Sequence, residues 1–501
     1  MNARIPEFAL NAVQALGQVS QKWDDDLVGQ LTDYIAIPAK SPTFDPEWSQ
    51  HGYLDTVLRN AAAWVQAQKV EGLTLEIIRI GARTPVLFFE VPASTGRSSS
   101  AAPDGKTTSG QTVLMYGHLD KQPEFNGWRN DLGPWTPKYE DGKLYGRGGA
   151  DDGYAVYASI AAIQALKSQG APHPRIVGLI ETCEESGSHD LLPYVDALRQ
   201  PDNNRLGDVS LVICLDSGAG NYDQLWLTSS LRGMASGVLK VEILTEGVHS
   251  GDASGLVPSS FRIMRQVLDR LEDSATGRLL PSSFHCEVPP DRLAQATATA
   301  AILGDEVYKR FPWAHYDCGG STAFALPVTT DPVQALLNRT WTPTLSVTGA
   351  EGFPSLQDAG NVLRPYTAFK LSLRLPPLVE AASAVQQLKT LLEDNAPYQA
   401  RVTFEGAGAA TGWNAPTTMP WFEKALNAAS QAYFDAPCGY IGQGGTIPLM
   451  NMLSKGFPKA QMMVCGVLGP RSNAHGPNEF LHVPYAKKLT AAVAQVIAQV
   501  P

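Results

Sequence analysis

The sequence is poor in cysteine and has no long apolar run. Six cysteines in 501 residues are too few for a disulfide framework, which excludes a small disulfide-stapled scaffold. No apolar run is long enough to cross a bilayer. The first residues, MNARIPEFALNAVQALGQ, have one arginine and no continuous apolar core, so they do not resemble a signal peptide. We therefore expect a soluble cytoplasmic protein without membrane partners.

Basic residues are also scarce relative to acidic ones. The chain has 39 Lys and Arg residues against 49 Asp and Glu residues, which gives a net charge of −10. An acidic chain without basic runs is a poor partner for nucleic acid or for an anionic membrane. The chain also exceeds the roughly 250–300 residues that one hydrophobic core serves, so at least two domains are expected.

Apolar β-branched runs alternate with helical patterns in both outer parts of the chain, and this alternation indicates the fold class. It predicts an α/β domain with a doubly wound, mainly parallel sheet, formed by residues 1–229 and 407–501. Between them, residues 230–406 read as an inserted α+β domain with alternating strands. In doubly wound sheets the site lies at the carboxyl ends of the strands.

Potential metal ligands follow the apolar runs at five points, all of them at predicted strand ends or turns. They are His118, Asp151, Glu185, Asp216 and His475. Taken singly, each residue could be a helix cap or a solvated turn residue. Together, two histidines and three carboxylates are the right inventory for two zinc ions that share one bridging carboxylate.

Two further acids suit supporting roles. Glu184 and Glu185 are neighbours, so one can bind metal while the other takes a proton from metal-bound water. Asp120 lies two residues after His118 on an extended chain, so both side chains point the same way and Asp120 can orient the imidazole. Lys121 follows, and it either contacts the substrate or lines the rim of the site.

Six motifs, in order along nearly the whole chain, resemble one enzyme family. They are GHLDKQPE, GRGGADDG, ETCEESGS, LDSG, HSGDASG and NAHGPNE. Together they are similar to the di-zinc exopeptidases and deacylases that include carnosinase, cytosolic nonspecific dipeptidase, carboxypeptidase G, succinyl-diaminopimelate desuccinylase and aminoacylase. The first motif most resembles the branch of carnosinase and nonspecific dipeptidase.

The resemblance assigns the metal ligands. His118 and Asp216 would hold one ion, Glu185 and His475 would hold the other, and Asp151 would bridge them. It implies two Zn²⁺ per chain, with Mn²⁺ or Co²⁺ as possible substitutes. It also implies a cis peptide bond between Asp151 and the residue that follows it.

The resemblance also assigns the catalytic groups. Glu184 would be the general base, and Asp120 would tune His118. The inserted domain, residues 230–406, would be a lid that also forms a homodimer. His249 in HSGDASG would stabilise the oxyanion, typically from the partner subunit.

Substrate-binding residues are assigned on two segments. Arg364 in GNVLRPY matches the position at which the dipeptidase branch of the family has an arginine that binds the substrate carboxylate. Asn361 just before it is a plausible polar contact. Gly445 and Thr446 lie in GQGGTIP, residues 442–448, whose backbone N–H groups can bind a carboxylate.

These residues predict a metal-dependent hydrolase that cleaves the amide bond of dipeptides or similar small substrates with a free carboxylate. The attacking group would be a metal-bridging hydroxide, with a glutamate as general base. The nearest alternative is an N-acyl amino acid deacylase or a carbamoyl amidohydrolase with the same site. Two further alternatives are a binding protein that has lost turnover and a protein with one structural zinc.

Overall fold

The computed structural model describes residues 10–94, 111–318 and 321–501. These residues form two compact units. Of these described residues, unit 1 comprises those in the ranges 1–228, 415–441 and 453–501, and unit 2 comprises those in the ranges 229–414 and 442–452. Among the described residues, no helix combines the length and the apolar character that crossing a bilayer requires.

Unit 1 is built on a six-stranded sheet with the strand order β1-β2-β6-β3-β9-β21. Its strands are β1 (Thr74–Ile78), β2 (Val86–Val91), β3 (Gln111–His118), β6 (Arg175–Glu181), β9 (Asp208–Cys214) and β21 (Gln461–Val464). The four strands from β6 to β21 pair in parallel, whereas β1 and β2 are antiparallel additions at one edge. The prediction of an α/β domain with a mainly parallel sheet is therefore confirmed.

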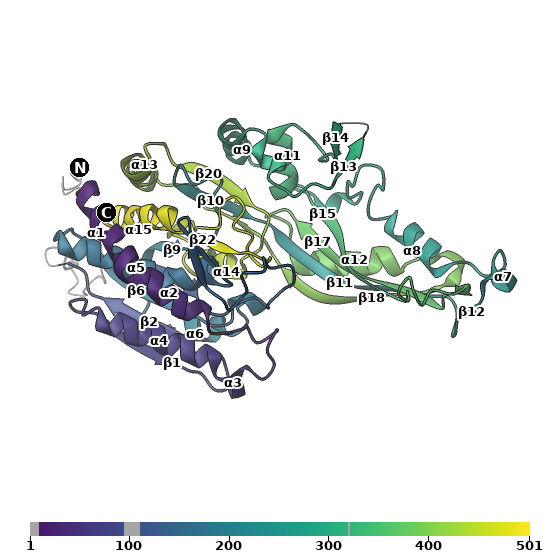
Figure 1. The fold of residues 1–501 in the computed structure, drawn as a ribbon, viewed down its shortest axis with the longest axis horizontal. Helices are drawn as coiled ribbons and strands as arrows, with labels where there is room; N and C mark the ends of the chain where they lie inside the picture. Colours follow the sequence, from purple (N-terminus) through teal and green to yellow (C-terminus); the bar gives the residue numbers. More distant parts are fainter. Residues whose placement is uncertain (1–9, 95–110, 319–320) are drawn as a thin grey trace. The chain divides into compact units, whose positions relative to one another are not determined.

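Helices cover the parallel strands, which explains why those strands are apolar along almost their whole length. They are α1 (Ala12–Lys22), α2 (Val28–Ile35), α3 (Trp48–His51), α4 (Tyr53–Ala67), α5 (Tyr154–Ser168), α6 (Leu191–Leu198), α13 (Pro420–Phe434) and α15 (Val483–Ile497). Helix α5 packs against both β3 and α15, and twelve of its fifteen residues are buried. A helix that is apolar all round is a core helix, and Figure 1 shows α5 and the yellow α15 side by side.

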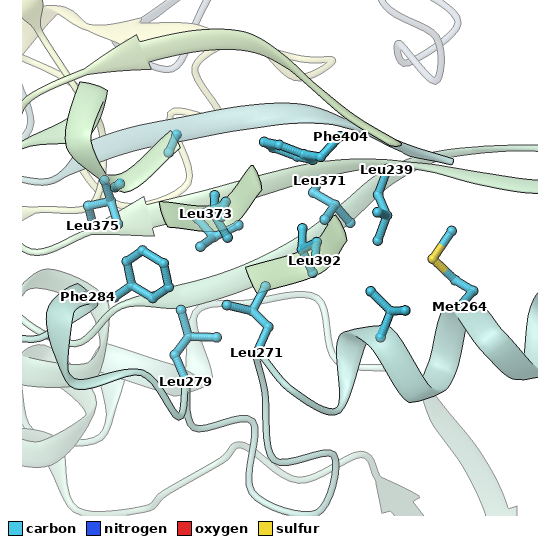
Figure 2. Close-up of a cluster of buried hydrophobic side chains, with 14 of the residues drawn as sticks. Leu239, Met264, Leu271, Leu279, Phe284, Leu371, Leu373, Leu375, Leu392 and Phe404 are labelled. Atoms are coloured by element: carbon cyan, nitrogen blue, oxygen red, sulfur yellow. The ribbon is translucent and has the colours of Figure 1, made fainter. Parts of the chain in front are cut away.

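Unit 2 has a four-stranded antiparallel sheet in the order β15-β17-β11-β18. Its strands are β15 (Thr344–Glu351), β17 (Tyr366–Leu375), β11 (Gly233–Glu242) and β18 (Arg401–Ala410). Buried and less buried residues alternate along β11, as expected for a sheet with one face in a core. The core lies between this face and helices α8 (Ser260–Leu268) and α12 (Ala381–Glu393). Figure 2 shows Leu239, Leu371 and Phe404 in this cluster.

Smaller elements of unit 2 lie outside this sheet. They are the ribbon of β12 (Val248–His249) and β16 (Val362–Leu363), the hairpin of β13 (His315–Cys318) and β14 (Ser321–Phe324), and the helices α7 (Ser250–Ala253), α9 (Pro290–Leu303), α10 (Glu306–Lys309) and α11 (Pro332–Thr340). Helices α9, α10 and α11 have a small core of their own, which contains Ala300, Val307 and Leu336. Residues 442–452, which include the glycine-rich loop, group with unit 2, and the sequence-based boundaries did not anticipate this.

Candidate metal centre and substrate-binding residues

The carboxyl ends of the parallel strands supply most of the candidate ligands. His118 is the last residue of β3, and Asp216 lies two residues beyond β9. Glu184 and Glu185 begin a short 3-10 turn that follows β6. Because β6, β3 and β9 are adjacent and parallel, their ends bring these side chains to one edge of the sheet.

Two loops complete the set. Asp151 lies in a π-helical turn, Gly149–Gly153, directly before α5, and the bond between Asp151 and Asp152 is cis, as the resemblance implied. His475 lies in the loop after β21, with φ of 64°. The five candidate ligands, which are scattered over more than 350 residues of sequence, therefore meet within unit 1.

The five side chains form two groups that share Asp151. His118, Asp151 and Asp216 have ligand atoms within 4.8 Å of one another, and so do Asp151, Glu185 and His475. His118 Nε2 lies 3.6 Å from Asp151 Oδ1 and 3.9 Å from Asp216 Oδ2. His475 Nε2 lies 2.9 Å from Asp151 Oδ2 and 3.5 Å from Glu185 Oε2. Each oxygen of Asp151 thus faces a different histidine, which fits two metal ions with one bridging carboxylate.

The chemistry of this group also fits cations. The Nε2 atom of His118 is fully buried and has no hydrogen-bond partner in the protein. Burial and the neighbouring Asp151 raise the pKa of Glu185 to about 8, and burial, partly offset by His118, raises the pKa of Asp216 to about 7. Although burial lowers it, the nearby Glu185 and Asp151 raise the pKa of His475 to about 10. Buried carboxylates that repel one another are stabilised by bound cations.

Asp120 positions the turn that carries both glutamates. Its carboxylate accepts hydrogen bonds from the backbone N–H of Glu184 at 3.1 Å and of Glu185 at 2.9 Å. The Nδ1 atom of His118 lies 3.1 Å from the backbone oxygen of Asp120 and 3.5 Å from its carboxylate. Asp120 thus holds the glutamate turn and the His118 ring in one arrangement. Burial, and after it the charge of Asp216, raises the pKa of Glu184 well above its usual range, as suits a proton acceptor and donor.

Two basic residues near the centre have structural contacts that sequence reasoning missed. Arg147 is buried and donates to the backbone oxygens of His475 at 2.9 Å and Gly476 at 3.0 Å, and it pairs with the buried Glu479. Lys121 is fully buried, and its Nζ donates to the backbone oxygens of residues 34, 35 and 37. The interpretation that Lys121 contacts substrate or lines the rim is therefore wrong. Only the position of Arg147 inside the motif GRGGADDG hinted at its role.

The candidate substrate residues fall into two groups within unit 2. His249 pairs with Val362 across the β12–β16 ribbon, and the backbone oxygen of Asn361 accepts from the N–H of Ser250 at 2.9 Å. Arg364 follows this ribbon, two residues before β17 begins. His249 and Asn361 are exposed.

Gly445 and Thr446 belong to the other group. Thr446 Oγ1 accepts from Arg374 at 3.2 Å and donates to the backbone oxygen of Arg232 at 2.6 Å. Arg374 is near the end of β17, so roughly 30 Å of extended strand separate it from Arg364. The glycine-rich loop therefore contacts Arg374, an arginine that sequence reasoning did not select, and Arg364 lies beyond the opposite end of the same strand.

Comparisons with known proteins agree with this architecture. Residues 114–499 match the family described as Peptidase family M20/M25/M40. Among curated proteins, a cysteinylglycine-S-conjugate dipeptidase of Corynebacterium striatum is 28% identical over 447 residues, which cover 85% of this chain and 88% of that protein.

Solved structures show the same fold. The di-peptidase Dug1p of Saccharomyces cerevisiae superposes with a TM-score of 0.73 at 21% identity, and the match covers 99% of this chain and 100% of that chain. Human carnosine dipeptidase 1 superposes with a TM-score of 0.72 at 22% identity, with coverage of 97% and 100%.

Proposed function

Because the chain belongs to peptidase family M20/M25/M40, it is a hydrolase, and we propose that it is a dinuclear metallo-dipeptidase. The preferred substrates are dipeptides with a free terminal carboxylate. The similarity to the Corynebacterium striatum protein, a dipeptidase, supports this substrate class. An N-acyl amino acid deacylase with the same residues is the competing assignment.

One observation carries the proposal: Asp151 presents its two oxygens to two different histidine-containing groups. We assign His118 and Asp216 to one ion, Glu185 and His475 to the other, and Asp151 to both. Zinc is the expected metal because imidazole and carboxylate ligands suit it, and Mn²⁺ or Co²⁺ are substitutes. When bound, the two ions polarise the scissile carbonyl and lower the pKa of a water molecule.

The remaining steps belong to side chains. Glu184 takes the proton from the attacking water and returns it to the leaving amine, while Asp120 holds the backbone of Glu184 in place. His249 stabilises the oxyanion of the tetrahedral intermediate. We assign His249, Asn361 and Arg364 to one functional group because they lie together at the β12–β16 ribbon. This group acts from the partner subunit of a homodimer formed through unit 2.

The substrate carboxylate needs a cationic partner, and unit 2 offers one, Arg374, beside the glycine-rich loop. Arg374 and Thr446 are hydrogen-bonded to each other, and a Cβ atom at Gly445 would meet no atom within 4 Å. Arginine binds carboxylates in a bidentate manner. We therefore place carboxylate recognition on Arg374, Gly445 and Thr446.

The free buried cysteines of the described chain, among them Cys183 and Cys214, suit a reducing compartment such as the cytoplasm.

A substrate screen tests the proposal. Purified protein reloaded with Zn²⁺ or Mn²⁺ is incubated with a dipeptide library, with the same dipeptides as C-terminal amides, and with N-acetyl amino acids, and losses are followed by mass spectrometry. We expect loss of free dipeptides, little loss of their amides, and about two metal ions per chain. Loss of N-acetyl amino acids alone would make the protein a deacylase. No hydrolysis of any compound with two ions bound would reject the enzymatic proposal.

A further inference from the structure

Unit 2 contains a line of four arginines from distant parts of the chain. Arg232 lies directly before β11, Arg310 directly follows α10, Arg339 lies in α11, and Arg374 lies in β17. Arg232, Arg339 and Arg374 all donate hydrogen bonds to the glycine-rich loop, and the charge of Arg310 is near enough to lower the pKa of Arg339. We call these four residues the arginine cluster.

Three members of the arginine cluster contact the glycine-rich loop. Arg339 donates to the backbone oxygen of Gly442 at 3.2 Å, Arg232 donates to that of Gly444 at 3.3 Å, and Arg374 donates to Thr446 Oγ1 at 3.2 Å. A Cβ atom on Gly444 would lie 3.2 Å from the Arg232 guanidinium. The loop therefore lies against the guanidinium groups, and its glycines permit this approach.

The arginine cluster lacks counter-charges. Within the part of the chain that the structure describes, none of the four side chains forms an ion pair with a carboxylate. The Nε atom of Arg339 is fully buried and has no hydrogen-bond partner. Burial and the charges of Arg310 and Arg232 lower the pKa of Arg339 to about 9, and burial and Arg374 lower the pKa of Arg232 to about 10.

A purely structural role does not account for this arrangement. Arg339 and Arg374 each donate one hydrogen bond to the loop, and Arg232 donates one to the loop and one to Thr344, so only part of the five donors of each guanidinium is used. The four arginines are partly buried, and like charges shielded from water without partners destabilise a fold, so proteins ordinarily pair or remove them. A bound anion would satisfy the free donors and offset the repulsion. Arg374 and Thr446 account for one carboxylate under the proposed function, which leaves Arg339 and Arg310 without an assigned ligand.

We propose that Arg339, Arg310 and Arg232 form a second anion subsite that binds the side-chain carboxylate of an acidic residue at the C-terminal position of the substrate. This inference rests on the proposed function and specifies its substrate class. The preferred substrates are then dipeptides that end in Glu or Asp. Arg374 reads the terminal carboxylate, and the other three arginines read the additional negative charge.

Matched substrate pairs test the inference without any mutation. Ala-Glu and Ala-Gln have nearly the same shape and differ in charge, as do Ala-Asp and Ala-Asn. We expect kcat/KM to be about tenfold or more higher for the acidic member of each pair, because hydrogen bonds between charged groups are the strong ones. Equal kcat/KM values within a pair would overturn the inference and leave the dipeptidase assignment intact.

Variants locate the effect. Arg339→Gln should reduce the Ala-Glu to Ala-Gln preference to near one, because it should lower kcat/KM for Ala-Glu by a larger factor than kcat/KM for Ala-Gln. Arg310→Gln should act in the same direction, and Arg339→Lys should keep part of the preference because it keeps a charge. Arg265→Gln is the matched control, since Arg265 is an exposed arginine of α8 in the same unit. A preference that survives Arg339→Gln and Arg310→Gln would overturn the inference.

Anion binding gives a readout that does not need catalysis. Glutarate should raise the Tm of the wild-type protein more than butyrate at the same ionic strength, and Arg339→Gln should remove the difference. This measurement separates the two proposals: no dipeptide hydrolysis with specific glutarate binding rejects the proposed function only. Sulfate that stabilises as well as glutarate, together with equal cleavage of Ala-Glu and Ala-Gln, would show a general anion site and overturn the inference.

Discussion

Unit 1 gathers buried carboxylates around two imidazoles, whereas unit 2 gathers guanidinium groups around a glycine-rich loop. The pKa values move in opposite directions: those of Glu185 and Asp216 are raised, and those of Arg232 and Arg339 are lowered. In both places the shift disfavours the charged form, because like charges lie together away from water. Each cluster thus lacks counter-charges: positive ones in unit 1 and negative ones in unit 2. We infer that each is completed by its ligand, cations in unit 1 and an anion in unit 2.

The largest effect should come from removing the base while keeping the metal cluster. Glu184→Gln should lower kcat by roughly 10³-fold or more, because the attacking water loses its proton acceptor. Metal content, measured by plasma mass spectrometry, should stay at the wild-type value. Glu185→Gln is the matched control on the next residue, and it should lose metal instead. Normal turnover by Glu184→Gln would show that another group is the base.

Asp151 and Asp216 distinguish a shared ligand from a single-site ligand. Asp151→Asn should weaken binding of both ions, whereas Asp216→Asn should weaken binding of one. Equilibrium dialysis with Zn²⁺ should therefore show about two, one and well below one ion per chain for wild type, Asp216→Asn and Asp151→Asn. Equal loss in the two variants would contradict the bridging role of Asp151.

A substitution of Arg374 tests whether the arginine cluster contributes to substrate binding and not to metal binding. Arg374→Gln should raise KM for dipeptides by roughly 10–100-fold, because it removes a charge-assisted hydrogen bond to the carboxylate. Its metal content should not change. Arg364→Gln serves as the comparison, since Arg364 lies beyond the opposite end of β17. A larger effect of Arg364→Gln than of Arg374→Gln would return carboxylate recognition to the residue that the sequence first indicated.

The smallest effect on activity should come from Glu181, a buried carboxyl of unit 1 outside the ligand set. It accepts from Tyr116 at 2.6 Å and Ser188 at 2.8 Å, and burial raises its pKa from an ordinary 4.5 to about 7. Because the folded pKa is the higher one, the stability that Glu181 contributes is complete below about 4.5. It is lost as the pH rises through about 7.

Glu181→Gln removes this titration. The free energy of unfolding of the variant minus that of the wild type should increase by on the order of 2–3 kcal/mol between pH 4.5 and pH 8. Urea unfolding of the metal-free proteins across this range measures the difference. A difference that does not change with pH would show that folding does not raise the pKa of Glu181.

The grouping of the candidate metal ligands could be predicted from the sequence because the topology of the sheet determines it. His118, Glu185 and Asp216 each follow an apolar run, and parallel neighbouring strands bring such positions together whatever their loops do. Asp151 and His475 were selected as residues of turns that follow apolar runs, and the resemblance then assigned their places in the ligand set. The backbone support from Arg147 could not be predicted beyond its place in the motif GRGGADDG, since it depends on how two loops meet.

The arginine cluster could not be predicted from the sequence for a physical reason. Antiparallel pairing of β11 with β17 brings Arg374 near Arg232. The other two arginines lie at helices α10 and α11, in a segment that the sequence pattern did not allow us to assign. The same limit applies to Arg364 and Arg374. Both lie in or next to β17, and the local sequence does not indicate which end of this strand contacts residues 442–448. That choice is made by the register of β17 with β11, in which Arg374 pairs with Met234.

The insertion of unit 2 into unit 1 also imposes an order on biosynthesis. Asp151 and Glu185 leave the ribosome before residues 229–414, but their partner His475 leaves after them. Strand β21 and helix α15, which complete the sheet and its cover, also come last. Since domains fold as units while the chain is made, unit 2 can fold on a nascent chain whose first half still lacks its final strand. The group of Asp151, Glu185 and His475 is therefore complete only once translation is almost finished, so under the proposed function both ions bind only then.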